Sequence, residues 1–253
     1  MDFIFVTIIG ALWGSFANVC ILRLPESKGV VSGRSYCPNC KKLITWKDNI
    51  PIISFLLLKG KCRQCKKPIS FQYTLVEFLS LISFLSIYYL YGISLTTLLL
   101  IILAITFIII FFIDLKHFII PNSLTFPLMA LGFIKSFIPN LDEIFPNYID
   151  SLIGGLFGYG IIWSIIFFYK QVRKKDGMGL GDAKLFAVIG FWFGWISIPF
   201  VIFLSSIIAL LSVLPDLIKN SKKMTTQIPF GPYIIIGTLV YLFFENNFRS
   251  IIF

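Results

Sequence analysis

Two aspartates stand where apolar runs meet polar breaks, and their neighbours suit a shared reaction site. Asp114 closes one apolar run, and Asp182 opens another after glycines at alternate positions, Gly177, Gly179 and Gly181. Two carboxylates held close together cannot both ionise at low cost, so they share a proton. The ionised partner then takes a proton from water while the protonated partner polarises a carbonyl. The pair therefore predicts peptide-bond hydrolysis without a covalent intermediate, and it leaves the two roles unassigned because such a pair titrates as a unit.

The backbone around both aspartates is expected to be open to an extended peptide. Pro121 breaks the helix after Asp114 and leaves irregular backbone nearby. Gly179 and Gly181 allow backbone conformations closed to other residues and carry no side-chain bulk. We therefore expect a peptide to reach the second carboxylate along the backbone of these two glycines.

The sequence offers few residues or motifs for other kinds of catalysis. His117 is the only histidine, and a loop or helix-end position explains it better than a role as base. The chain contains no GxSxG, HExxH or Walker sequence. Among the other acids near apolar runs, Asp216 suits a headgroup-level pair with Lys219, whereas Glu77 lies one turn inside its run and suits packing or substrate contact.

The composition places these groups in a membrane protein. Apolar residues make up 57% of the chain, the mean hydropathy is +0.89, and only 13% of residues are charged, against about 25% in soluble domains. The first apolar run follows the acidic Asp2 and lacks a basic flank, so we expect a retained span rather than a cleaved signal peptide. The net charge of +10 fits membrane orientation better than nucleic-acid binding, because no basic stretch is interleaved with aromatic residues.

The expected fold is all-α, a polytopic transmembrane helical bundle of about eight spans. A spanning helix needs about 20 apolar residues, within a range of roughly 17–25. The candidate spans are Phe3–Leu22, Thr74–Tyr91, Leu95–Ile113, Asn122–Ile138, Tyr148–Tyr169, Ala183–Ile196, Ile198–Ile218 and Gly231–Phe244.

The basic residues set the expected orientation. Of the 22 lysines and arginines, 20 lie in segments 23–73, 114–121, 170–184 and 218–228, which eight spans would place on one side of the membrane. Positive charge marks the cytoplasmic side. We therefore expect these segments, the catalytic pair included, at the cytoplasmic face, and both termini outside.

Segment 23–73 is expected to be the one sizeable piece outside the membrane, between a first span at 1–22 and a bundle at 74–253 that carries the protease site. Its cysteines form two CxxC pairs, Cys37 with Cys40 and Cys62 with Cys65. This spacing is typical of a structural zinc site with four thiolate ligands. Disulfides or unrelated thiols are the alternatives, and a reducing compartment disfavours disulfides. Cys20 is expected to be an inert packed residue.

Two further patterns leave alternatives open. The apolar stretch 49–58 is too short to span, so it either lies at the membrane interface or docks on the bundle. Gly154 and Gly158 are four residues apart, as are Gly190 and Gly194. This spacing either brings two helix backbones into close contact, which would fix the helix that carries Asp182, or reflects ordinary membrane glycines.

Nearly the whole chain resembles the type IV prepilin peptidases, or leader peptidases, of the GxGD aspartic protease group. The resemblance is specific because five motifs occur in the family's order. They are Gly14–Val19 with Arg23–Pro25, the two CxxC pairs, Asp114 with Ile120–Asn122, Gly179–Lys184, and Ile228–Pro232.

The resemblance implies an endopeptidase of the bacterial plasma membrane. It would remove short basic leaders from type IV prepilins and pseudopilins at the cytoplasmic face, with Asp114 and Asp182 as the catalytic pair. It also implies zinc in the cysteine loop and, as in many members, methylation of the new N-terminus with S-adenosylmethionine. No glycine-rich nucleotide motif of soluble methyltransferases occurs here, so this second activity is implied by the resemblance alone.

Two rival functions remain to be weighed. Presenilin-like and signal-peptide-peptidase-like proteases share GxGD, but in them a Tyr usually precedes the first aspartate and a PAL motif follows later. Here Ile113 precedes Asp114, and the late motif is Pro229–Pro232. A proton-coupled transporter would use paired carboxylates, but its internal repeat with broken helices is not seen.

Overall fold

The structure is a computed structural model that describes residues 2–31, 35–139, 141–142, 144–174, 177–218 and 227–244. Within these ranges the chain is helical, and its only strand-like pairings are two isolated bridges. The expected pairing of Asp216 and most of segment 218–228 lie outside the described residues. The elements are α1 (Asp2–Arg23), η1 (Trp46–Asn49, a 3-10 helix), α2 (Ile53–Leu57), α3 (Phe71–Tyr91), α4 (Leu95–His117), α5 (Asn122–Lys135), α6 (Tyr148–Arg173), α7 (Leu180–Phe193), α8 (Ser197–Ile218) and α9 (Gly231–Phe243).

The all-helical class is confirmed, and each of the eight expected apolar segments contains a helix. Five of these helices, α1, α3, α4, α6 and α8, are long and apolar enough to cross a membrane, so the chain is a multi-pass membrane protein. Helices α5, α7 and α9 have only 14, 14 and 13 residues. At 1.5 Å per residue they reach about 20 Å, less than the roughly 30 Å hydrocarbon core. Full crossing by these three helices therefore stays a prediction.

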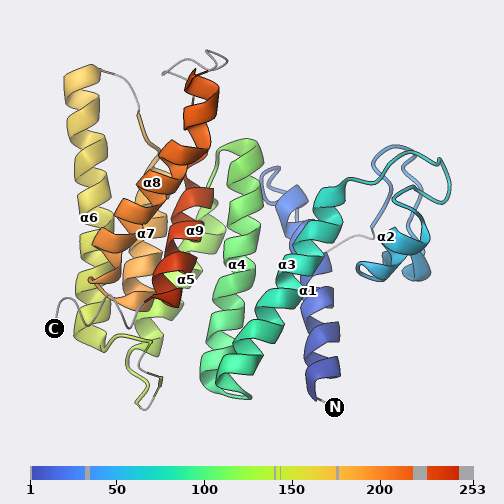
Figure 1. The fold of residues 1–253 in the computed structure, drawn as a ribbon, viewed down its shortest axis with the longest axis horizontal. Coiled ribbons are helices and arrows are strands. Elements are labelled where there is room, and N and C mark those ends of the chain that lie inside the picture. Colours follow the sequence, from blue (N-terminus) through green and yellow to red (C-terminus); the bar gives the residue numbers. More distant parts are fainter. Residues whose placement is uncertain are drawn as a thin grey trace. The chain divides into compact units, whose positions relative to one another are not determined.

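The chain divides into two compact units, Met1–Ile109 and Ile110–Phe253, with α4 contributing to both. In the first unit α1 and α3 lie side by side (Figure 1). Two polar contacts join them: the Ser80 hydroxyl donates to the Gly10 carbonyl at 2.7 Å, and the Asn18 amide donates to the Tyr73 carbonyl at 3.0 Å. These bonds satisfy polar groups that would be costly to leave unpaired in this pair of helices.

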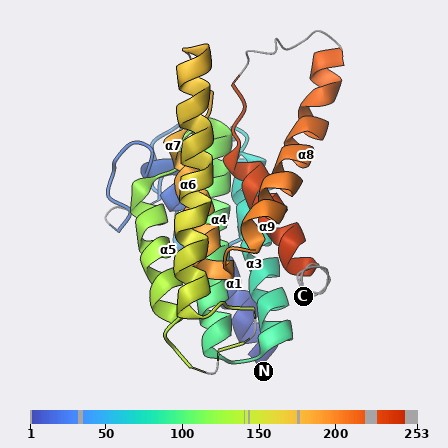
Figure 2. The same cartoon turned by 90° about the vertical axis from the view of Figure 1, so that its left-hand side faces the viewer.

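The second unit is organised around α7, which packs against α6 and α5 (Figures 1 and 2). A Cβ atom added to Gly154 would come within 2.5 Å of the Gly190 carbonyl oxygen and 2.6 Å of the Gly194 carbonyl carbon. The expected close approach of the two helix backbones is therefore confirmed. It leaves α7 buried along most of its length and fixes the helix that carries Asp182.

Candidate active site and metal centre

Asp182 lies in the first turn of α7, and its side chain is only 8% exposed. Its Oδ2 atom accepts a hydrogen bond from the Gly179 N–H at 3.2 Å. Gly179 is the N-cap of the helix, so the carboxylate reaches back to one of the free N–H groups at the helix start. The positive end of the helix dipole also favours a negative charge at this position.

Asp114 lies one turn before the end of α4 and is 5% exposed. Its Oδ2 atom accepts the N–H of Gly231 at 2.9 Å. Gly231 is the first residue of α9, so this carboxylate, like Asp182, is held by a helix N-terminus. Ile120 lies close both to Gly231, which holds Asp114, and to Gly181, which precedes Asp182, so the second unit places the two carboxyls in one region.

Gly231 and Gly181 leave just enough room for this arrangement. A Cβ atom on Gly231 would lie 2.7 Å from Asp114 Oδ2 and 3.3 Å from Ile120 Cδ1. A Cβ atom on Gly181 would lie 3.0 Å from Ile120 Cβ. Ile120 therefore packs between the two glycines, next to Asp114, and any larger residue at either position would press on the site.

The glycines before Asp182 do not serve the unusual backbone conformations that were expected of them. Gly179 has φ −82°, and Gly181 is not among the residues with positive φ. Neither glycine uses a backbone conformation closed to other residues. At Gly181 the requirement is the absence of a side chain, because of Ile120. A Cβ atom at Gly179 would make only ordinary contacts, with Asp182 Oδ2 at 3.7 Å and the Gly181 nitrogen at 3.8 Å.

The structure adds two features that the sequence pattern did not assign. The Gly231 N–H belongs to the late motif Ile228–Pro232, and nothing in that motif indicated that this N–H group binds Asp114. Lys184, two residues after Asp182, donates to the Asn122 side-chain oxygen at 2.6 Å and lies 5.5 Å from the centre of the Phe126 ring. This bond joins the starts of α5 and α7. His117 is the exposed last residue of α4, as expected.

The four loop cysteines come together in the first unit. The sulfur atoms of Cys37, Cys40, Cys62 and Cys65 all lie within 4.8 Å of one another, and those of Cys37 and Cys65 are 3.9 Å apart. Four sulfurs about 2.3 Å from a zinc ion at the corners of a tetrahedron would be about 3.8 Å apart. All five cysteines are free thiols, and Cys20 is buried in α1, so this cluster could hold a metal ion.

The cluster is built from two turns of matching geometry. The N–H of Cys37 donates to the Lys42 carbonyl and that of Cys62 to the Lys67 carbonyl, each at 2.9 Å. Lys41 and Lys66 both have φ 59°, in the left-handed region. Repetition of one turn at both CxxC pairs presents four thiols to one point, as a four-thiolate site requires.

An ion pair supports the second cysteine turn. The Arg63 guanidinium donates to both carboxylate oxygens of Asp48 at 2.7–3.0 Å. This forked contact lowers the pKa of Asp48 below its ordinary value. Arg63 stands next to Cys62, so the pair ties the η1 helix to the second cysteine turn.

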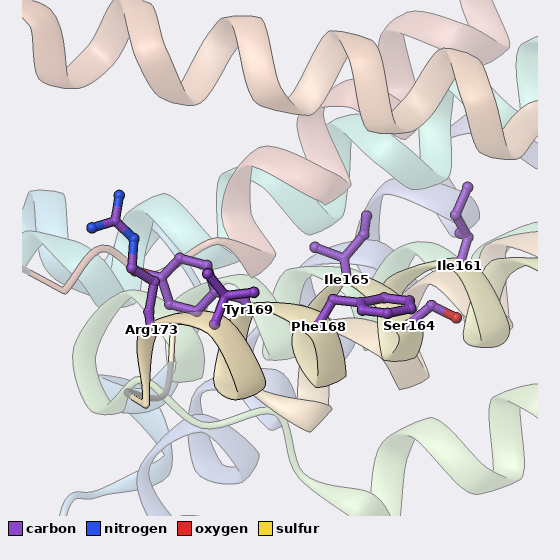
Figure 3. A pocket seen from close by; sticks show the side chains of 7 residues that line it. Ile161, Ser164, Ile165, Phe168, Tyr169 and Arg173 are labelled. Atoms are coloured by element: carbon purple, nitrogen blue, oxygen red, sulfur yellow. The ribbon is translucent and has the colours of Figure 1, made fainter.

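A shallow hollow on α6 includes neither the two aspartates nor the four cysteines among its lining residues. The side chains that line it, among them Ile161, Ile165, Phe168 and Tyr169, all project from α6 (Figure 3). They are mainly apolar, and neither aspartate lies among them. Such a surface on a long membrane helix is explained by contact with lipid.

The chain is similar to known proteins over nearly its full length. Residues 8–91 match the bacterial peptidase A24 N-terminal domain, and residues 101–214 match the type IV leader peptidase family. The prepilin leader peptidase/N-methyltransferase of Aeromonas hydrophila is 33% identical, over 97% of this chain and 91% of the relative. The proteins of that name from Xanthomonas campestris pv. campestris and Pseudomonas aeruginosa are 34% and 33% identical, over 94% and 98% of this chain and 90% and 92% of the relatives. No solved structure matches the chain.

Proposed function

Because the chain belongs to the type IV leader peptidase family, we propose that it is a membrane aspartic endopeptidase that removes the leader from prepilins and pseudopilins. The observation that carries this proposal is the meeting of Asp114 and Asp182 in the second unit, each held by a backbone N–H. Family membership favours this function over a transporter or a presenilin-like protease. Cutting of a prepilin-derived peptide after the last leader residue by purified protein would support it, and an uncut peptide would contradict it.

In this mechanism the aspartates share one proton. The carboxylate without it removes a proton from a water molecule, whose oxygen attacks the scissile carbonyl carbon. The protonated carboxyl donates to the carbonyl oxygen as the tetrahedral intermediate forms. When the C–N bond breaks, the leaving nitrogen takes up a proton from the pair, one hydroxyl of the intermediate returns a proton to the pair, and the other product is a carboxylic acid. The Gly179 and Gly231 N–H groups hold the carboxylates in place without being consumed.

The substrate backbone is placed along the glycines that precede α7. Gly179 carries no side chain, and an added Cβ atom would meet only Asp182 Oδ2 and the Gly181 nitrogen, which leaves room for an extended peptide beside Asp182. Both aspartates lie at helix ends, so a peptide can reach them without unfolding the surrounding helices. We place this face, and the cysteine loop, at the cytoplasmic side of a bacterial plasma membrane, with both termini outside, because the basic segments gather there.

The size of the residue at position 181 is expected to control activity. Gly181→Val should lower the cleavage rate sharply, because its side chain would push Ile120 toward Gly231 and Asp114. Gly181→Ala should be milder, since one methyl group requires Ile120 to move by only a few tenths of an ångström. The measurement is the cleavage rate of one prepilin, normalised to folded protein in the membrane. Equal rates for all three proteins would show that the stretch is an ordinary loop.

The metal in the cysteine cluster is proposed to be zinc, with a structural role. Four thiolates fill the tetrahedral shell, leaving no open position for a substrate. A small loop without a core of its own gains folding energy from such a site. Cys37, Cys40, Cys62 and Cys65 are the proposed ligands.

Metal analysis of purified protein should give about one zinc per chain, the stoichiometry of a single four-cysteine site. Cys62→Ala should lose the metal and expose segment 23–73 to protease, while the helical bundle stays folded. Cys20→Ala is the matched control and should retain the metal, because Cys20 lies in α1, away from the cluster. Intact disulfides and no zinc in protein kept under reducing conditions would overturn the assignment.

Methylation of the new N-terminus is proposed on the relatives' printed name. The methyl donor would be S-adenosylmethionine, which supplies an electrophilic methyl group to the free amine. No residue of this chain is assigned to that step.

A further inference from the structure

The cysteine loop contains a backbone turn that is rare for its residue type. Ile52 has φ 62° and ψ −52°, and the Ile53 N–H donates to the Pro51 carbonyl at 2.6 Å. This is a γ-turn with a positive central φ, a rare and strained form. A β-branched residue in this region is an outlier, so surrounding contacts must hold it there.

The contact that holds the turn is Glu77 of α3. Its Oε2 atom accepts the Ile52 N–H at 2.7 Å, and its backbone packs against Gly14 of α1, where an added Cβ atom would lie 2.6 Å from Glu77 Cα. Glu77 therefore joins three parts of the first unit. A carboxylate inside a membrane helix requires such partners. The sequence left open whether Glu77 serves packing or substrate contact, and these contacts favour packing.

Glu77 also sets the depth of the turn. It lies six residues after the start of α3, which is about 9 Å along the helix, and Gly14 lies about 14 Å from the end of α1 at 1.5 Å per residue. Helix α1 has 22 residues, about 33 Å, which matches the hydrocarbon core of about 30 Å. The Ile52 turn thus lies below the membrane surface at which these helix ends meet the loop.

The segment that follows the turn is suited to that depth. Helix α2 rises again toward the start of α3, where the Phe55 and Phe71 rings are 6.3 Å apart. On its other side Ile53, Leu56 and Leu57 are 54%, 66% and 75% exposed. Apolar side chains this open, at this depth, face lipid rather than water.

The backbone of the segment meets the same requirement. The N–H groups of Ser54, Leu56 and Leu58 donate to the Ile50, Ile52 and Ser54 carbonyls at 3.0, 3.2 and 2.9 Å. Non-helical backbone at membrane depth is tolerated only when its polar groups are paired in this way. Segment 50–58 contains no charged residue, whereas Lys47, Lys59 and Lys61 flank it.

We propose that segment 50–58 is a re-entrant element that dips into one leaflet, with Glu77 as its anchor and the surrounding lipid as its partner. Its apolar face, Ile53, Leu56 and Leu57, contacts acyl chains near the headgroup boundary. The flanking lysines lie at the level of anionic headgroups, as in interfacial helices. The cysteine loop is thereby tied to the membrane surface at its midpoint as well as at its two ends.

Photo-crosslinking to lipid tests this placement. A benzophenone amino acid is introduced at Leu57 in the full-length protein, in nanodiscs of phosphatidylethanolamine and phosphatidylglycerol. The matched control carries the same amino acid at Leu43, which is also a leucine of the loop, is 55% exposed against 75% for Leu57, and lies outside the segment. After irradiation, mass spectrometry should find lipid adducts at position 57 severalfold above those at position 43. Equal yields, or adducts to protein alone at position 57, would overturn the proposal.

The anchor is tested in the same assay. Glu77→Ala removes the acceptor for the Ile52 N–H, so lipid adducts at position 57 should fall severalfold. Glu77→Gln keeps a carbonyl oxygen at that place and should preserve them. If both variants give wild-type yields, Glu77 does not hold the segment. The comparison of positions 57 and 43 uses unmodified Glu77, so it decides the lipid contact even if Glu77→Ala fails to fold.

Discussion

Asp114→Asn and Asp182→Asn are each expected to abolish prepilin cleavage, lowering the rate by roughly 10³-fold or more, in line with the 10²–10⁴-fold typical of general acid–base groups. Asparagine has nearly the same shape, and its side-chain oxygen can still accept the Gly231 or Gly179 N–H. The loss should therefore come from the missing ionisable group. Membrane insertion and thermal stability should stay close to wild type in both variants.

The double variant sharpens this test. Groups that act as a unit give strongly non-additive effects, so the double Asn protein should be hardly slower than either single one. Rates are measured on one prepilin under conditions that saturate the wild-type enzyme. Substantial turnover by either single variant would rule out the aspartate pair.

Gly154→Ala is expected to destabilise the folded state strongly. Its new methyl group would meet the backbone atoms of Gly190, Gly194 and Trp195 at 2.5, 2.6 and 2.7 Å. Backbone cannot move aside as a flexible side chain can, so α6 and α7 must separate. Overpacking of this kind costs about 1–3 kcal/mol and occasionally more. The folded fraction and the melting temperature in detergent should both fall, and cleavage should fall with them because α7 carries Asp182.

Gly160→Ala is the matched control on the same helix. No atom lies within 4 Å of a Cβ atom at Gly160, and alanine favours a helix over glycine by about 0.5–1 kcal/mol. This variant should be as stable as wild type or slightly more so. Equal melting temperatures for the two variants would show that the close helix contact does not stabilise the bundle.

Local patterns predicted the parts of the site but not all of the contacts that join them. The apolar runs, the two CxxC pairs and the glycine spacing each depend on residues close in sequence, and the structure places helices, a thiol cluster and a tight helix contact there. The bond between Asp114 and the Gly231 N–H joins residues 117 positions apart. No periodicity or spacing rule reports on such a contact, so the role of Gly231 emerged only from the fold.

Two further differences have physical causes. Of the two reasons expected for glycine at position 181, the structure favours the absence of a side chain, because Ile120 leaves no room for one, whereas the backbone itself is ordinary. The expected span Asn122–Ile138 extends three residues past the end of α5, and the expected span Ala183–Ile196 begins and ends three residues later than α7. Hydropathy continues past Lys135 and Phe193, but Gly194 turns the chain with φ 80°, and α5 ends where Lys135 donates to the Trp192 carbonyl at 3.1 Å.

The most direct measurement is the mass of an intact prepilin after incubation with purified protein. With wild-type protein the substrate should lose the mass of its leader, and nothing else, when no methyl donor is added. With the double Asn variant the substrate mass should stay unchanged. An unchanged substrate with folded wild-type protein, or equal cleavage by the double variant, would contradict peptide hydrolysis by Asp114 and Asp182.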